Sequence, residues 1–514
     1  MKNKLNHIII KIALSISAIF FSTMSYSQDF LKLLPGSESL EFDEATGAQI
    51  LKGNVTFSYK DAVMYCDSAY YFQKENKLRA YSNIHLNQND TLNLFCDSMY
   101  YDGTTELAKL WGNVRFRDME YKLVTDSMDY NAASKYAVYR NGGVITSINS
   151  NEKLVSRVGY YHPDVKTFFF KDSVVYTSDD ATVTTDTLQF FSQTKNAKFF
   201  GPTDIYSDSN HIYCESGVYY FDEKEAQLSG NPYFEDGKVK FEADSIYYNS
   251  MLQVGEGFEN VIITDTTNKS IFKAEYAYSN DSTGYSILVD SALVMQFDTE
   301  DTLYLHADTL QAYRKDSVTK IFGYYGVQFM NSEMQGRCDS LYYSKQDSVI
   351  KMFTDPILWN DKNQITGDSI YLKTYEGEMQ KMLVHNNSFI ASEVDTIGYY
   401  NQIAGRNMIG YFTDNKLNTV HVNGNGKTVY YPESEKKTDT LITIERNGMN
   451  RVYCSNIRID LDSNSIEQIV FIDKPEAIFY PLNQINADEQ FIRGFNWRIA
   501  LKPKTWMDLF KDAE

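Results

Sequence analysis

The sequence predicts an elongated all-β fold in which repeats of about 30 residues stack into two facing sheets. Three observations support this prediction: a short motif returns at nearly constant spacing, apolar and polar side chains alternate within each copy, and Tyr (40) and Phe (31) are abundant among the 514 residues. Aromatic side chains favour strands, and alternation with period two is typical of a strand with one buried face. No long helical pattern competes with these signals.

The recurring motif centres on a mostly acidic residue, here called the anchor, which is usually followed by Ser or Thr and then by aromatic positions. It is clearest at residues 66–71, 96–101 and 338–343. Neighbouring anchors lie 29 to 33 residues apart, and the period loosens after residue 368. One repeat cannot cover its own apolar face, so stacked repeats would enclose a continuous interior. The anchor positions are 67, 97, 126, 157, 186, 215, 244, 275, 308, 339 and 368.

A second element lies between anchors and consists of an apolar run, the dipeptide Gly-Asn, and a further extended run. Copies occur at residues 49–57, 110–116 and 228–234. Gly, and to a lesser degree Asn, tolerates a positive φ, so the dipeptide predicts a tight turn or a bulge. Each repeat therefore holds at least two strands joined by short turns.

The chain begins with a pattern typical of a cleavable secretory signal. Lys2 and Lys4 precede a mostly apolar run, and Ser25 and Ser27 place small residues before the expected cleavage after Ser27. The alternative is a membrane anchor, for which about 20 apolar residues are needed. We expect a signal peptide at 1–27, regular repeats at 28–372, degenerate repeats with longer loops at 373–480, and a C-terminal tail at 481–514.

The tail differs in composition from the repeats, because Trp497 and Trp506 lie in a more basic stretch. One interpretation is a cap over the end of the stack, which repeat arrays need. The other is a docking element for a membrane or a partner protein.

The charge of the chain argues against nucleic acid as a partner. Losing the positive charges of Lys2, Lys4 and Lys11 with the signal peptide changes the formal charge from −19 to −22. Such a chain would repel phosphate backbones. Its acidity is spread along the sequence, which keeps strand edges soluble.

No motif in the sequence predicts an enzyme, a cofactor or a metal site. The anchor carboxylates recur once per repeat, so we expect them to hydrogen-bond backbone at a strand corner, whereas a catalytic pair needs a unique site. The His residues, among them His162, His211 and His385, lack ligand spacing. The Cys residues all precede an anchor position and are expected to be small buried residues, with a disulfide between Cys66 and Cys96 as the alternative. They are Cys66, Cys96, Cys214, Cys338 and Cys454.

The order of these motifs resembles the OstA-like domain found in LptA-type lipopolysaccharide transport proteins and in the periplasmic part of LptD. The resemblance is carried by residues 37–43, 51–55 and 66–71, then by the repeats to about 372, and more weakly to about 480. It implies an open β-jellyroll, or β-taco, of two facing antiparallel sheets. The chain is about three times longer than a single-domain LptA-type protein. We therefore expect an extended OstA-like protein without the outer-membrane barrel of LptD.

The resemblance also implies a function. We expect a periplasmic protein, associated with the outer membrane, that binds lipopolysaccharide or a related glycolipid and carries it toward that membrane. Acyl chains would lie in the apolar interior, and other OstA-like domains would join at the ends of the stack. The alternatives are a structural or adhesive envelope scaffold with a filled core and, third, a polysaccharide lyase on a parallel β-helix. The interior positions expected to contact lipid are Leu51, Val55, Phe57, Tyr71, Met99, Tyr101, Leu110, Val114, Phe116, Met128, Tyr130, Ile246, Tyr248, Leu341, Tyr343, Ile370 and Leu372.

Overall fold

The computed structural model describes residues 31–511 apart from short gaps, so the signal peptide expected at 1–27 lies outside the described residues. The chain divides into two compact units, Met1–Gly257 and Phe258–Glu514, which are described separately. The gaps lie at 61, 89–91, 118, 120, 132, 135, 163–166, 180, 192, 208–209, 299–300, 316–317, 376–377, 395–397, 439–440, 463–464 and 512–514.

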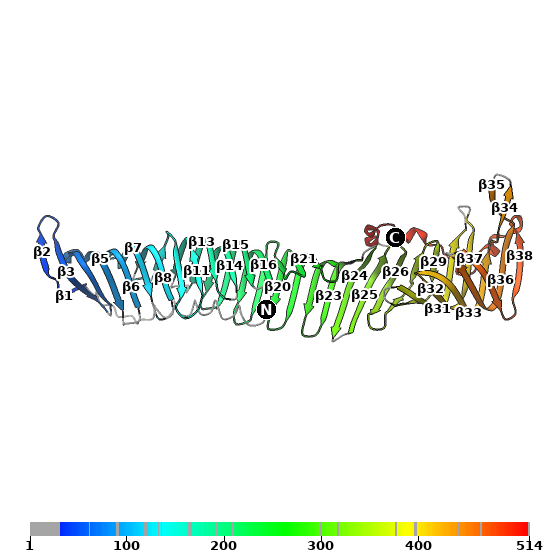
Figure 1. Ribbon diagram of the computed structural model, residues 1–514, viewed down its shortest axis with the longest axis horizontal. Helices are drawn as coiled ribbons and strands as arrows, with labels where there is room; N and C mark the ends of the chain where they lie inside the picture. Colours follow the sequence, from blue (N-terminus) through cyan, green and yellow to red (C-terminus); the bar gives the residue numbers. More distant parts are fainter. Residues whose placement is uncertain are drawn as a thin grey trace. The chain divides into compact units, whose positions relative to one another are not determined.

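Unit 1 is a run of antiparallel strands in which sequence neighbours pair with each other (Figure 1). Most of the long strands have 10 to 12 residues, and two of them form each regular repeat, as the sequence predicted. The strands are β1 (Lys32–Leu34), β2 (Ser39–Asp43), β3 (Ala48–Tyr59), β4 (Ala62–Phe72), β5 (Lys77–Gln88), β6 (Leu92–Asp102), β7 (Leu107–Arg117), β8 (Tyr121–Asn131), β9 (Tyr136–Tyr139), β10 (Gly143–Ser147), β11 (Lys153–Ser156), β12 (Val158–His162), β13 (Thr167–Thr177), β14 (Thr182–Phe191), β15 (Asn196–Ser207), β16 (Asn210–Tyr220), β17 (Glu225–Ser229), β18 (Tyr233–Glu235), β19 (Val239–Glu242) and β20 (Ser245–Asn249).

A corner divides each long strand into two halves. In β3, Lys52 pairs with Ser68 and Val55 with Cys66, so Gly53 and Asn54 together lie opposite the single anchor Asp67. Both residues have a positive φ, 71° for Gly53 and 50° for Asn54. The Gly-Asn dipeptide is therefore a β-bulge in the middle of a strand, and this bulge bends the strand.

The halves before and after the corners form two walls. We call the wall that contains residues 48–52 and 68–72 the first wall, and the wall that contains 55–59 and 62–66 the second wall. The walls are visible as separate ladders where a strand is interrupted. β17 pairs with β20 in the first wall, and β18 pairs with β19 in the second.

Unit 2 repeats this architecture with longer strands toward its C-terminal end, where β31, β33 and β36 have 15 or 16 residues. β21 (Val254–Asp265) contains the division between the units. The remaining strands are β22 (Ser270–Asn280), β23 (Tyr285–Phe297), β24 (Thr302–Lys315), β25 (Val318–Met330), β26 (Met334–Ser344), β27 (Val349–Phe353), β28 (Ile357–Asn360), β29 (Asn363–Thr366), β30 (Ser369–Tyr375), β31 (Glu378–Glu393), β32 (Tyr400–Thr413), β33 (Lys416–Tyr430), β34 (Glu433–Thr438), β35 (Leu441–Arg446), β36 (Gly448–Asp462), β37 (Ser465–Ile472) and β38 (Glu476–Pro481).

Helical structure among the described residues is confined to single turns. They are η1 (Gln73–Glu75), η2 (Leu482–Gln484), α2 (Ala487–Gln490), η3 (Ile499–Leu501) and η4 (Trp506–Phe510). No described helix is long and apolar enough to cross a bilayer. The all-β, antiparallel, repeat-built fold that the sequence predicted is confirmed.

Candidate functional site

The anchors sit at the corners, and their carboxylates bind the next bulge. Asp67 accepts a hydrogen bond of 2.7 Å from the Asn83 side chain, and Asp97 accepts one of 2.7 Å from Asn113. The first repeat does the same with Glu38 and Asn54, at 3.0 Å. The corner position was predicted correctly, but in these three repeats the partner is an Asn side chain instead of a backbone group.

The same contact crowds the glycines before Asn54 and Asn113. A Cβ atom added at Gly112 would lie 2.5 Å from Oδ2 of Asp97, so the carboxylate would have to shift, whereas before Asn83 the same bulge position is held by Ser82 with a φ of 62°. Gly53 is crowded by Glu38 in the same way. The repeated carboxylates are therefore part of the scaffold. Among the described residues, no group of three or more His, Cys, Asp or Glu side chains is placed to hold a metal ion.

The expected interior positions were compared with the burial of each side chain. Most are fully enclosed, and Phe116, Tyr130 and Tyr343 are partly buried against the cores. Tyr248 shares the inward face of its strand with the buried Ile246, but 37% of it is exposed. The fully enclosed positions are Leu51, Val55, Phe57, Tyr71, Met99, Tyr101, Leu110, Val114, Met128, Ile246, Leu341, Ile370 and Leu372.

In residues 48–131 of unit 1, here called the closed stretch, the interior is a packed core. Inward side chains such as Leu51, Leu78 and Val114 have no exposed surface. The Tyr71 hydroxyl, which burial alone would leave unsatisfied, donates to the Leu31 carbonyl at 2.9 Å. Burial also raises the pKa of Tyr71. Most inward side chains of the closed stretch are buried against one another, while Leu86, Phe116, Leu123 and Tyr130 are only partly buried.

In residues 210–249 of unit 1, here called the half-open stretch, the interior is less filled. Tyr219 packs against the neighbouring core yet stays partly exposed. Leu228, which faces Ile246 and Gly217 across the ladder, is also partly exposed. The same is true of Phe234 and Phe241, which pair with each other in the second wall.

Unit 2 has a comparable region around β23 and β24. Leu288, Val294 and Leu305 pack against its core but are only partly buried. Sequence reasoning missed these residues and, in the half-open stretch, named only Ile246 and Tyr248. Their repeat position could have revealed some of them, since Tyr219 lies four residues after an anchor position, as Tyr71 and Tyr101 do.

The cysteines are free thiols, so the alternative of a disulfide between Cys66 and Cys96 is not seen in this structure. Burial, with the neighbouring anchor carboxylate as a second cause, raises the pKa of Cys66 and of Cys96 to about 12. Thiols held so far from ionisation are poor nucleophiles at neutral pH. The expectation of small buried residues holds for four cysteines, and Cys454 is partly exposed.

The C-terminal tail docks on the strands of unit 2. Its residues bind side chains of β32, β29 and β25. The contacts therefore extend back along the wall, well beyond the last strands of the stack. Both sequence interpretations treated the tail as a terminal feature, and neither anticipated this path.

The antiparallel strands bent at corners and the apolar interior place the protein in the class of repeat-built, folded-over β-sheet proteins. Residues 33–186 match the family described as OstA-like protein, and residues 273–378 match the family of the LptA/LptD N-terminal domain, a lipopolysaccharide transport protein. The chain therefore contains OstA-like and LptA/LptD-like regions, which confirms the resemblance drawn from its motifs.

Two further comparisons add little. LptH of Pseudomonas aeruginosa, described as the LptA-homologous periplasmic component of a lipopolysaccharide transport device, aligns over 29% of this chain and 95% of its own, at 12% identity and a TM-score of 0.22. Similarity at that level supports no inference about this chain. The comparison with curated proteins gave no significant match.

Proposed function

We propose that this protein carries lipopolysaccharide or a related glycolipid through the periplasm toward the outer membrane, as a bridge or a chaperone. Acyl chains would lie between the two walls, and the sugar and phosphate groups would stay outside. The role is passive and non-enzymatic, with the energy supplied elsewhere. OstA-like domains of the transport machinery would be the protein partners at the ends of the chain.

One observation carries this proposal: the interior is apolar, and in parts it is not filled by the protein's own side chains. An apolar surface takes up an acyl chain by area, at about 0.8 kcal/mol per buried CH₂ group, without demanding an orientation. The partly exposed Tyr219, Leu228 and Phe241 supply such a surface in unit 1. The family matched by residues 273–378, described as a lipopolysaccharide transport protein, supports the same cargo.

The structure shifts the proposed lipid contacts away from the closed stretch. Val114 and Met128 are enclosed by their own core, so an acyl chain would have to displace packed side chains there. The half-open stretch requires no such displacement. We therefore place the primary contacts at Leu228, Phe234 and Phe241, and at Leu305 in unit 2.

The test is photo-crosslinking in living cells. Leu228, which faces inward, is replaced by p-benzoylphenylalanine, and Gln227, its exposed neighbour in the same strand, is the matched control. We expect a lipopolysaccharide adduct at 228 and little or none at 227. Equal labelling at both positions, or none at either, would overturn the proposed path.

The alternative function is a structural envelope scaffold, and the closed stretch favours it. A core without exposed apolar surface, as around Leu51 and Leu78, needs no ligand to be stable. Lipid mass spectrometry on protein purified under mild conditions separates the two functions. Lipid A-type acyl species at about one per chain support transport, and lipid-free protein that also fails to bind added lipopolysaccharide supports the scaffold.

A further inference from the structure

Three buried glutamines on the outer face of the second wall of unit 2 hold the C-terminal tail. They are Gln402, Gln364 and Gln328, none more than 4% exposed. Outward side chains of a sheet normally face solvent, so their burial needs an explanation. The tail supplies it, because each glutamine donates a hydrogen bond to a backbone carbonyl of the tail.

Two of these glutamine side chains each donate one hydrogen bond to the tail's backbone and accept one from it, as the backbone of a neighbouring strand would. Gln402 donates from Nε2 to the Gln490 carbonyl at 2.9 Å and accepts from the Ile492 N–H at 2.8 Å. Gln364 donates to the Asn496 carbonyl and accepts from the Arg498 N–H, both at 2.7 Å. A side-chain amide that gives and receives one hydrogen bond recognises an extended backbone, whatever its side chains.

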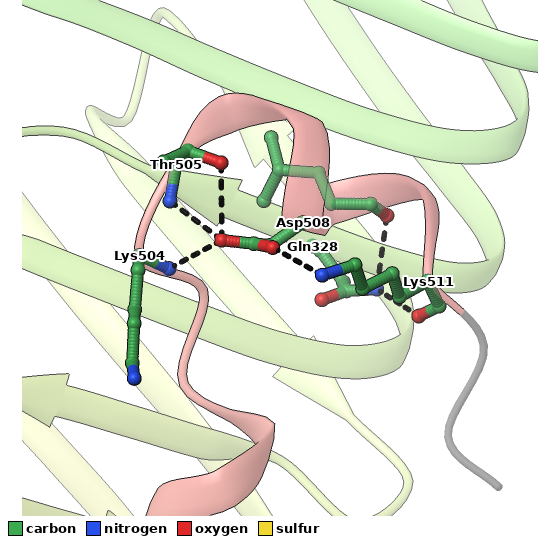
Figure 2. Close-up of polar contacts among 6 residues, drawn as sticks. Gln328, Lys504, Thr505, Asp508 and Lys511 are labelled. Atoms are coloured by element: carbon green, nitrogen blue, oxygen red, sulfur yellow. Dashed lines mark hydrogen bonds and ion pairs between the residues drawn. The ribbon is translucent and has the colours of Figure 1, made fainter.

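The third contact holds the tip of the tail, residues 503–511. Gln328 donates to the carbonyls of Leu509 and Lys511, at 3.0 and 3.2 Å (Figure 2). Phe510 lies against the His306 ring with centroids 4.4 Å apart, and Trp506 stacks on Tyr304 at 6.3 Å. Leu509 has no exposed surface and anchors the tip.

The tip is held together by its own contacts as well. Asp508 accepts hydrogen bonds from the N–H groups of Lys504 and Thr505, at 3.0 and 2.7 Å, and from the Lys511 ammonium at 2.7 Å (Figure 2). These bonds lie within the tip and do not involve the wall. The turn of the tip is therefore stabilised by contacts of its own.

The two ends of the tail differ in how firmly they are attached. Ile492, near the start, belongs to an apolar cluster with Phe389, Tyr431 and Met449, which is packed by Phe495 and Trp497. At the tip, Leu509 is buried, but Met507 is 63% exposed, and the wall beneath presents Gln328 and His306. Release of the tip would expose Leu509 and the rings of Trp506 and Phe510. Release of the start would expose the larger apolar cluster around Ile492.

The position of the tip connects it with the interior. Tyr304 and His306 point outward from β24, and Leu305 between them points inward, where it is only partly buried. The tip thus lies on the back of the strand whose inner face is partly open.

We propose that residues 503–511 are a latch: docked, they hold the β24–β25 part of the second wall in place, and released, they let that part move and widen the interior behind Leu305. The start of the tail stays attached and acts as the hinge. The latch itself is independent of the cargo, and only its effect on lipid entry rests on the proposed function.

Hydrogen–deuterium exchange on the full-length mature protein tests the latch. Gln328→Ala and Leu509→Asp each remove one attachment of the tip. We expect backbone exchange at 302–307 and 327–330 to become at least tenfold faster, with 62–66 in unit 1 unchanged. Gln335→Ala is the matched control, because Gln335 is 8% exposed and donates to the Asn331 carbonyl in its own turn.

The outcomes separate the latch from the cargo. Faster exchange at 503–511 with unchanged exchange at 302–307 would overturn the latch, because the tip would then bind the wall without stabilising it. Photo-crosslinking at 305 adds the second readout: stronger lipopolysaccharide labelling in both variants supports gating of entry. Labelling that is strong but unaltered by release would overturn gating. Absence of labelling at 228 and 305 together with faster wall exchange would overturn the cargo and leave the latch standing.

Discussion

The closed and half-open stretches of unit 1 have the same repeat and different interiors. The closed stretch is built from strands of 11 or 12 residues that pass through both walls. In the half-open stretch, β17 to β20 have only three to five residues each. Short strands alone do not open the interior, because β27 to β29 in unit 2 have only four or five residues while Met352, Leu358 and Ile365 have no exposed surface. The side chains that line the interior therefore also decide whether it is filled.

The two stretches differ in the residue that follows the Gly-Asn bulge, which is proline in the half-open stretch. The bulge at Gly112-Asn113 is followed by Val114, whose N–H and side chain continue the second wall. The bulge at Gly230-Asn231 is followed by Pro232. Proline has no N–H to donate and within sheets is confined to strand starts, edges and bulges. β17 ends at Ser229 and β18 begins only at Tyr233.

The largest difference should come from a buried charge. Val114→Asp places a carboxylate in the closed core without a partner, and we expect a loss of about 4 kcal/mol in the free energy of unfolding. Leu228→Asp leaves the carboxylate partly hydrated and should cost about 1 kcal/mol. Chemical denaturation measures both. Equal losses would remove the distinction between the stretches.

Cavity formation should separate the stretches by a smaller amount. Leu78→Ala empties a fully enclosed site and should cost about 3 kcal/mol. Leu228→Ala removes contacts that were already incomplete, so about 1 kcal/mol is expected. Thermal unfolding of both variants provides the comparison, and a larger loss for Leu228→Ala would show that residues 210–249 are the better packed region.

Removing the hydrogen bond between an anchor carboxylate and the Asn of the next bulge should lower the free energy of unfolding by a similar amount in each repeat that has it. Asp97→Ala removes the acceptor for Asn113 and should cost about 1 kcal/mol. Asn113→Ala removes the donor, and a double-mutant cycle isolates the pair. A coupling energy of zero would mean that the bulge alone maintains the corner.

The smallest expected effect is the pH dependence of stability that the buried thiols cause. Burial raises the pKa of Cys66 above its ordinary 9.0 to about 12 and that of Cys214 to about 11. A raised thiol pKa stabilises the fold below pH 9 and loses that contribution as pH rises toward the folded-state value. Stability should therefore fall between about pH 9 and pH 12.

Alkylation at pH 8 resolves the individual thiols. We expect Cys214 to react several-fold faster than Cys66, because local opening is easier next to short ladders. Mass spectrometry of the labelled peptides provides the rates, and Cys454, partly exposed, marks the fast limit. If Cys66 reacted first, the closed stretch would be the more mobile one.

Much of the fold could be predicted because the repeat is local. Alternation at Met99 and Tyr101, and the Gly-Asn dipeptide at 53–54, depend on neighbouring residues and on the φ preferences of Gly and Asn. Most of the expected interior positions are buried. The exposure of Tyr248 was not predictable, because alternation shows the direction of a side chain and says nothing about what lies opposite it.

The sequence by itself determined the strands, their period, the corners and the apolar character of the interior, since all four follow from contacts within one repeat. Only the tertiary structure decided which interior side chains are covered, which Asn each anchor binds, and where the tail lies. Gln328 and Leu509 are 181 residues apart and meet through one backbone carbonyl. Contacts at such separation depend on how the walls are assembled, and no local pattern encodes them.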